Sequence, residues 1–159
     1  MKTVKQMTLP QLVMNAAEQF GEAVAIQEAH QQFTFNELNA LRIQAGQAFI
    51  AAGIEKGDRV AIWAPNVAEW VIAAIGLQSA GGVLVPINTR MKGSEAAFII
   101  NNSGAKMLFT VAGFLDIDYP KMLADQEMMI TASIGISLYP DDGTDADMLM
   151  RRADTALYE

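Results

Sequence analysis

The sequence predicts an α/β fold in which a mostly parallel sheet is flanked by helices. Two segments, Arg59–Trp63 and Val83–Ile87, are apolar over almost their whole length. Strands of this kind are covered on both faces, as they are in parallel sheets. Segments in which apolar residues recur at helical spacing alternate with these strands. Such alternation is typical of a parallel sheet with helices packed on it.

The order of the elements follows from apolar spacing and from residues that begin or end helices. Thr8, Asn36 and Ser94 can each begin a helix, because their side chains accept hydrogen bonds from the first turn. Gly21 and Gly53 can each end one. The expected elements are a helix from Thr8 to Gly21, strands at Val24–Ile26 and Phe33–Phe35, a helix from Asn36 to Gly53, a strand at Arg59–Trp63, a helix at Ala68–Ala80, a strand at Val83–Ile87, a helix at Glu95–Asn101 and a strand at Lys106–Val111.

Residues 112–127 are less regular, and the pattern resumes after them. A strand is expected at Met129–Leu138, and Thr144 or Asp145 is suited to begin a helix that continues to the C-terminus. We expect this last strand and helix to complete a sheet of about five or six strands. The whole of residues 1–159 would then be a single composite domain.

Composition excludes several classes of function. The 159 residues carry a formal net charge of −7 and include no cysteine. An acidic chain repels nucleic acid and anionic lipid, so neither is expected as a partner. The absence of cysteine excludes disulfides and thiolate sites and fits a cytoplasmic protein. The most apolar stretch, Trp70–Ile87, is interrupted by polar residues, glycines and a proline, so no membrane span is expected.

Residues 1–124 resemble the N-terminal segment of an acyl-CoA synthetase of the adenylate-forming superfamily. Three segments carry the resemblance in family order: FTFNELN (Phe33–Asn39), Gly53–Gly76 with GDRVAIWAPNVAEW, and Gly81–Thr110 with GGVLVPINTRMKG. The resemblance implies activation of a carboxylic acid by ATP and magnesium, followed by transfer to coenzyme A. It also implies a phosphate-binding loop of the SGTTGxPKG type, which these residues do not contain. We therefore expect no cofactor and assign no catalytic residue.

Residues 125–159 resemble a different family, the C-terminal end of a GGDEF (diguanylate cyclase) domain. The resemblance is carried by ITASIGISLYP (Ile130–Pro140) and by MLMRRADTALYE (Met148–Glu159). The GGDEF hairpin itself is absent from the sequence, so the resemblance does not imply cyclase activity. A change of resemblance near residue 125 suggests that fragments of two families have been recombined.

Three functions remain open at this point. The preferred one is a chimeric or recombinant folded domain with no native ligase or cyclase activity. The first alternative is a ligase remnant that still binds a nucleotide or an acyl group. The second is an adventitious enzyme activity in a cleft created by the fusion. Imperfect completion of the sheet would also favour a homodimer, through an open sheet edge or by strand exchange.

Candidate ligand-binding residues follow two of the expected strands. In an open α/β sheet, ligands bind at the carboxyl ends of the strands. Asn66 and Trp70 follow one apolar strand, and Asn88, Thr89 and Arg90 follow the next.

No metal site is expected. His30 is the only histidine and falls in a polar turn. The acidic run Asp141–Asp147 lacks the spacing of a calcium loop and is better explained as a turn followed by a helix N-terminus.

Overall fold

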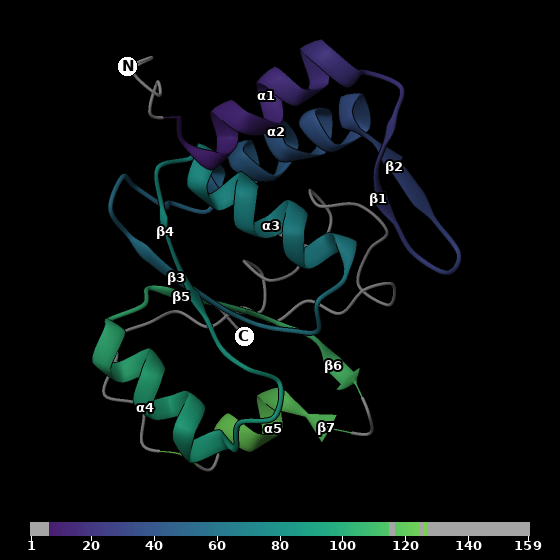
Figure 1. The fold of residues 1–159 in the computed structure, drawn as a ribbon. Helices are drawn as coiled ribbons and strands as arrows, with labels where there is room; N and C mark the ends of the chain where they lie inside the picture. The colour runs from purple at the N-terminus through teal and green to yellow at the C-terminus, as the bar shows by residue number, and fades with distance from the viewer. Residues whose placement is uncertain (1–6, 115–116, 125, 127–159) are drawn as a thin grey trace, which may run out of the picture.

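The computed structural model describes residues 7–114, 117–124 and 126. Helices and strands alternate along most of this part (Figure 1). The elements are α1 (Leu9–Phe20), β1 (Val24–Gln27), β2 (Gln32–Thr34), α2 (Phe35–Ala51), β3 (Arg59–Trp63), α3 (Ala68–Ser79), β4 (Val83–Pro86), α4 (Gly93–Ser103), β5 (Met107–Thr110), β6 (Ala112–Phe114), β7 (Ile117–Asp118) and α5 (Tyr119–Ala124).

A parallel sheet in the order β4-β3-β5 forms the middle layer. Val60 of β3 is in register with Leu84 of β4 on one side and with Met107 of β5 on the other. Two antiparallel pairs, β1 with β2 and β6 with β7, lie outside this sheet. The expected α/β fold with a parallel sheet between helices is confirmed.

The central strand β3 sends alternate side chains to two separate cores, and Val60, Ala61, Ile62 and Trp63 are all 0 % exposed. Val60 and Ile62 pack with residues of α2 and α3. Ala61 and Trp63 pack with residues of α4 and α5. Complete burial of a large apolar side chain contributes about 1.5–3 kcal/mol. β3 therefore holds the helices of both faces.

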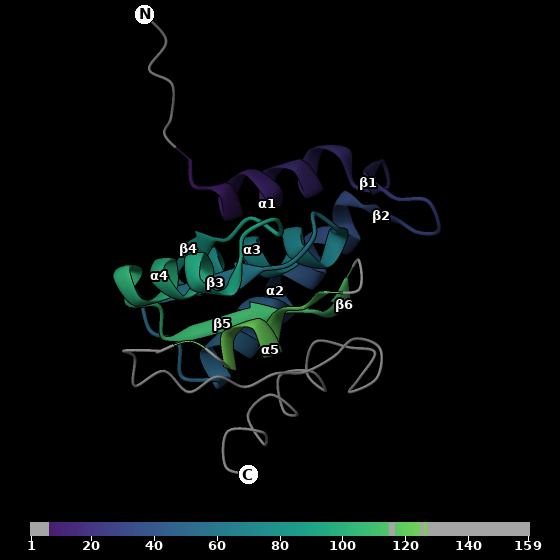
Figure 2. The same ribbon diagram turned by 90° about the horizontal axis from the view of Figure 1, so that it is seen from below.

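The helices lie in layers on the two faces of the sheet. α2 and α3 cover one face, and α1 packs on both of them as the outermost helix (Figure 1). α4 and α5 lie on the opposite face, as the second view also shows (Figure 2). Two crossovers produce this arrangement, because the chain passes from β3 to β4 through α3 on one face and from β4 to β5 through α4 on the other.

Two of the expected helix starts are wrong by two residues. Thr34, rather than Asn36, caps α2, because its hydroxyl accepts the Glu37 N–H at 3.2 Å and the Glu37 carboxylate accepts the Thr34 N–H at 2.8 Å. α4 begins after Lys92 rather than after Ser94, since Glu95 accepts the Lys92 N–H at 2.8 Å. In both cases a glutamate in the first turn decides the helix start.

Three expectations fall wholly or partly on residues outside the described ranges. These are the strand at Met129–Leu138, the helix after Thr144 or Asp145, and the completion of the sheet by these two elements. The described residues place three strands in the parallel sheet. A single composite domain over residues 1–159 stays a prediction.

α2 and α3 approach each other closely at two glycines, and this contact gives a stability prediction. A Cβ added to Gly76 would lie 2.4 Å from the Ala45 Cβ and 3.1 Å from backbone atoms of α2. We expect Gly76→Ala to separate the helices and lower the free energy of unfolding by about 1–3 kcal/mol. Urea unfolding measures the change, and Gln47→Ala on the exposed side of α2 is the control. An unchanged or higher stability in Gly76→Ala would contradict this close packing.

The homodimer expected from the sequence also stays a prediction. Within the described residues, β4 and β5 each pair on one side only, with β3. An unpaired strand edge is a template for pairing with another chain. Sedimentation at high micromolar concentration should therefore show a dimer, whereas a clean monomer would count against it.

Candidate functional site

A pocket of about 360 Å³ opens at the carboxyl ends of β3 and β4. The strands are parallel, so both chains leave the sheet at this edge. The chain after β3 turns to α3 on one face, and the chain after β4 turns to α4 on the other. Neighbouring loops that diverge in this way leave a crevice, which is where open α/β sheets bind ligands. The lining residues are Ala64, Pro65, Asn66, Trp70, Pro86, Ile87, Asn88, Thr89 and Phe114.

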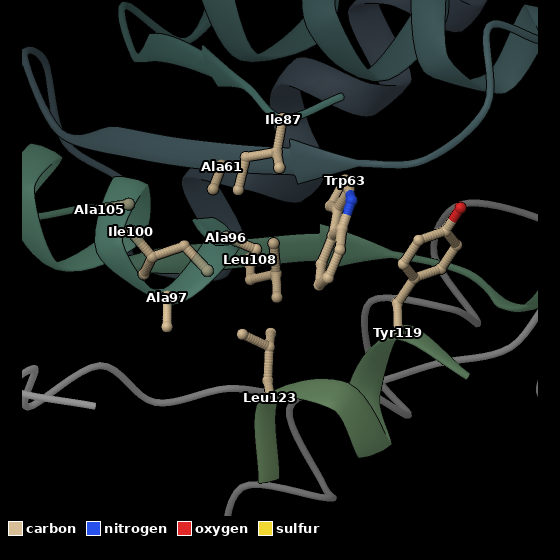
Figure 3. Close-up of a cluster of buried hydrophobic side chains, with 10 residues drawn as sticks. All are labelled: Ala61, Trp63, Ile87, Ala96, Ala97, Ile100, Ala105, Leu108, Tyr119 and Leu123. Atoms are coloured by element: carbon tan, nitrogen blue, oxygen red, sulfur yellow. The ribbon is translucent and has the colours of Figure 1, made fainter. Parts of the chain in front are cut away.

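Two buried aromatic residues hold the loop after β4 from below. The Trp63 indole N–H donates to the Asn88 carbonyl at 3.0 Å, and the Tyr119 hydroxyl donates to the Thr89 carbonyl at 3.2 Å. Their rings lie next to each other, with centroids 4.5 Å apart and planes tilted by 57° (Figure 3). Both residues are 0 % exposed, so neither has room to move to another rotamer. The carbonyls of consecutive residues on the pocket wall are therefore fixed by the core.

Burial also affects the titration of Tyr119. Desolvation raises the pKa of the Tyr119 phenol above the ordinary value, and the smaller effect of the Thr89 side chain opposes this only in part. The phenol therefore stays neutral in the folded protein and remains a hydrogen-bond donor. Its role is to position the loop, because it lies in the core and does not line the pocket.

The polar side chains of the pocket are uncharged and largely unused. The Asn88 side-chain oxygen accepts the Arg90 backbone N–H at 2.9 Å, so its NH₂ group points away from that bond. Within the described part of the chain, the Asn66 amide makes no hydrogen bond. The Asn66 and Asn88 side chains therefore have donors and acceptors available for a ligand.

The loop after β3 is held from outside by the β1–β2 hairpin. Val67, at the start of α3, has no side chain that could cap the helix. Instead, the Glu28 carboxylate accepts the Ala68 N–H at 2.8 Å. Gln31 from the same hairpin donates to the other Glu28 oxygen at 2.6 Å. Glu28 of the β1–β2 hairpin thus caps the N-terminus of α3, the helix that contains Trp70.

A strong ion pair lies at the opposite, amino edge of the sheet. Lys106 and Asp58 are joined at 2.7 Å between the starts of β5 and β3. The hydrogen bond from Lys106 holds the pKa of Asp58 below its usual range, and the Glu55 N–H adds to the effect. This pair ties strand starts together at the far end of the strands from the pocket.

The structure brings four of the five predicted site residues together. Asn66, Trp70, Asn88 and Thr89 line the pocket, whereas Arg90 is exposed in the next position of the loop and is not part of the lining. That any of the five binds a ligand stays a prediction. The sequence reasoning missed Phe114 and Glu28. Phe114 follows β5 and was predicted only as part of an irregular segment, and the contact of Glu28 joins segments 40 residues apart.

The described residues contain no group of three or more histidine, aspartate or glutamate side chains that could hold a metal ion. His30 is exposed in the turn between β1 and β2. The acidic run Asp141–Asp147 lies outside the described ranges. The expectation of no metal site therefore stays a prediction. No helix among the described residues is both long and apolar enough to span a membrane.

The sequence pattern of the AMP-binding enzyme family matches residues 13–155, which is most of the chain. The chain belongs to this family. A curated relative, the methyl-dioxo-octahydro-indenyl propanoyl:CoA ligase of Rhodococcus jostii, is 33 % identical over 146 residues, which are 92 % of this chain and 28 % of that ligase. The chain thus spans about a quarter of the length of the curated relatives it matches.

Solved structures of AMP-binding enzymes share this fold. The N-terminal domain of FACL13 from Mycobacterium tuberculosis matches with a TM-score of 0.75 and 27 % identity, over 94 % of this chain and 36 % of that one. The o-succinylbenzoate CoA synthetase of Bacillus subtilis, in complex with its acyl-adenylate intermediate, matches with a TM-score of 0.63 and 28 % identity, over 76 % and 34 %.

These matches overturn the preferred functional expectation. A chimeric domain without native ligase activity is wrong as the main interpretation, because the family match continues to residue 155 and the relatives are CoA ligases. The alternative, a ligase segment that binds a nucleotide or an acyl group, fits better. The resemblance of residues 125–159 to a GGDEF domain has no support from these matches. Among those residues, only Gln126 lies within the described ranges.

Substitution of Tyr119 tests how the core supports the loop after β4 at the pocket. Tyr119→Phe removes the hydrogen bond to the Thr89 carbonyl and should lower the free energy of unfolding by about 1 kcal/mol near neutral pH. The same variant should change the pH dependence. Because the folded pKa of Tyr119 is raised, its contribution is fully present below the unfolded value of about 10 and is lost as the pH rises through the folded value.

Urea unfolding over alkaline pH measures both effects. The wild-type protein should lose more stability than Tyr119→Phe as the pH rises above about 10. Trp63→Phe, which removes the neighbouring bond to the loop, should leave the alkaline loss in place. An equal alkaline loss in Tyr119→Phe and wild type would show that Tyr119 is not the group responsible.

Proposed function

We propose that this chain is the segment of an adenylate-forming CoA ligase that binds an acyl or nucleotide portion of its ligands between β3 and β4. The observation that carries the proposal is the pocket at the divergence of the α3 and α4 connections, in a chain of the AMP-binding enzyme family. The activities of similar proteins support the proposal, since one is a CoA ligase and another was crystallised with an acyl-adenylate.

In such a ligase, a carboxylate oxygen attacks the α-phosphorus of ATP, and pyrophosphate leaves. The thiol of coenzyme A then attacks the acyl carbon, and AMP leaves. Both steps need backbone N–H groups and cations around phosphate. The pocket residues of this chain are uncharged, so their contribution is to bind and orient a ligand rather than to neutralise phosphate charge.

The pocket has the properties expected of a small-molecule site. Such sites are concave, are usually about 300–1,000 Å³ in volume, and combine apolar walls with a few polar groups. Here the walls are provided by Trp70, Phe114 and Ile87, and the polar groups by two asparagines and a threonine. The core bonds from Trp63 and Tyr119 preform the loop after β4, which reduces the entropy that binding would cost.

Thermal unfolding with added ligands tests the proposal. At about ten times its dissociation constant, a ligand that binds only the folded state stabilises by about 1.4 kcal/mol. For a chain of this size we expect the midpoint temperature to rise by about 3–6 °C. ATP, AMP and an acyl-CoA are the ligands to be compared, each at millimolar concentration.

Two variants connect the shift to the pocket. Asn66→Ala should reduce it, whereas Asn102→Ala, on an exposed position near the far end of α4, should not. No shift with any of the three ligands, in a chain that unfolds cooperatively, would remove the proposed function. A shift that Asn66→Ala leaves intact would place binding elsewhere on the chain.

A further inference from the structure

We infer that the pocket between β3 and β4 holds an uncharged ring that carries hydrogen-bond acceptors, and not a phosphate or carboxylate group. This inference rests on the proposed function, because it specifies which portion of a ligase ligand occupies that pocket. Three features of the described residues carry it: an uncharged lining, free donors between aromatic walls, and carboxylates on both helices that begin beside the pocket.

The lining residues that the structure describes contain no ionisable carboxylate, ammonium, guanidinium or imidazole group. A buried anion is stable in a protein only when a positive charge or several hydrogen bonds compensate for the lost water. The cations of the neighbouring loop, Arg90 and Lys92, are both exposed and are not part of the lining. An anionic group in this pocket would therefore gain no partner of opposite charge from the described lining residues.

The shape and chemistry of the walls fit a ring. Trp70 and Phe114 supply aromatic surface, and Ile87 and two prolines supply aliphatic surface. Aromatic side chains pack favourably on planar ligands in stacked or edge-on arrangements. A volume of about 360 Å³ is at the lower end for ligand sites, which suits one ring system better than a whole nucleotide.

The available polar groups specify acceptors on that ring. Asn88 uses its side-chain oxygen to accept the Arg90 N–H at 2.9 Å, which leaves its NH₂ group as a donor to the pocket. The Asn66 amide adds two donors and one acceptor. Ring nitrogens or ring carbonyl oxygens are the uncharged partners that such donors satisfy.

Helix N-termini are the usual alternative to a cation for binding an anion, but here both are already supplied with carboxylates. At α3, Glu28 accepts the Ala68 N–H at 2.8 Å, and Glu69 lies in the first turn. At α4, Glu95 accepts the Lys92 N–H at 2.8 Å. The favourable end of each helix dipole thus faces a negative charge of the protein itself. A ligand anion near the start of α3 would meet the like charge of Glu28, and the Ala68 N–H is already occupied.

Two ligase ligands contain rings of this chemistry: the adenine of the nucleotide and a cyclic acyl group. The adenine and the cyclic acyl group both carry uncharged hydrogen-bond acceptors, but their ring systems differ. Two matched pairs of probes distinguish binding of the ring from binding of the charged group. They also distinguish adenine from a cyclic acyl group. Adenosine and AMP share the adenine, and benzamide and benzoate share a benzene ring, with only the second member of each pair carrying the acidic group.

The experiment is a titration of the full chain followed by nuclear magnetic resonance. The side-chain NH₂ signals of Asn66 and Asn88 and the indole N–H of Trp70 report on the pocket directly. The chain has two tryptophans, and Trp63 is 0 % exposed, so Trp70→Phe assigns the indole signals without ambiguity. Inorganic phosphate is titrated separately, and Asn102→Ala serves as the folded control.

At least one uncharged probe should shift the Asn66, Asn88 and Trp70 signals together. We expect AMP to bind no more than about threefold more tightly than adenosine, benzamide to bind more tightly than benzoate, and phosphate to leave these signals unmoved. Asn66→Ala should weaken the binding of the uncharged probe about three- to tenfold, as expected for loss of one hydrogen bond. Asn102→Ala should change nothing. Comparison of the adenosine and benzamide titrations then shows whether the pocket prefers the adenine or the cyclic acyl group.

The inference is overturned if phosphate moves the pocket signals, if an anionic probe binds tenfold or more tightly than its uncharged partner, or if no uncharged probe moves them. These results are distinct from failure of the proposed function. Stabilisation by ATP, AMP or acyl-CoA without a response to uncharged rings would overturn only the inference. Binding of uncharged rings without any response to those three ligands would overturn only the proposed function.

Discussion

The structure depends on β3, a strand of five residues that is buried on both faces. Its alternate side chains enter two separate cores, so one strand holds the α1–α2–α3 layer and the α4–α5 layer together. The two crossovers on opposite faces follow from this double burial, because each face needs its own helix. The pocket follows in turn, since the connections after β3 and β4 must diverge. Fold and site thus have one physical origin, the removal of Val60, Ala61, Ile62 and Trp63 from water.

The pocket is supported by the polar atoms of two aromatic residues whose rings belong to the apolar core. Trp63 and Tyr119 bury their rings among Leu108, Leu123 and their neighbours and use their single polar groups to hold consecutive carbonyls of the β4–α4 loop. A tryptophan or tyrosine suits this position because one end packs and the other bonds. The loop therefore inherits the rigidity of the core, although Asn88 itself is exposed. This explains how two short surface loops can present amide groups in a fixed arrangement.

Much of the fold could be predicted from the chain, and the reasons for the failures are specific. The apolar runs around Trp63 and Val83 predicted buried parallel strands, and the asparagines after them predicted the edge where the pocket lies. The helix starts were displaced because glutamates in the first turn, Glu37 and Glu95, compete successfully with nearby asparagine or serine caps. Glu28 could not have been found, since its partner at Ala68 is set by how the hairpin docks. The functional interpretation gave too much weight to a short resemblance after residue 125, whereas the family match continues through it.

The long-range cap on α3 has a consequence for the order of folding. A helix whose first turn is capped by its own neighbouring residues needs no distant partner for that cap, but α3 has no such local cap. Its first free N–H is satisfied by a carboxylate from 40 residues earlier, across α2 and β3. Closing a loop of this length costs chain entropy before the contact can stabilise the fold. We therefore expect this contact to form late in folding. The start of α3, and with it one wall of the pocket, is thereby completed only after the hairpin, α2 and the sheet have come together.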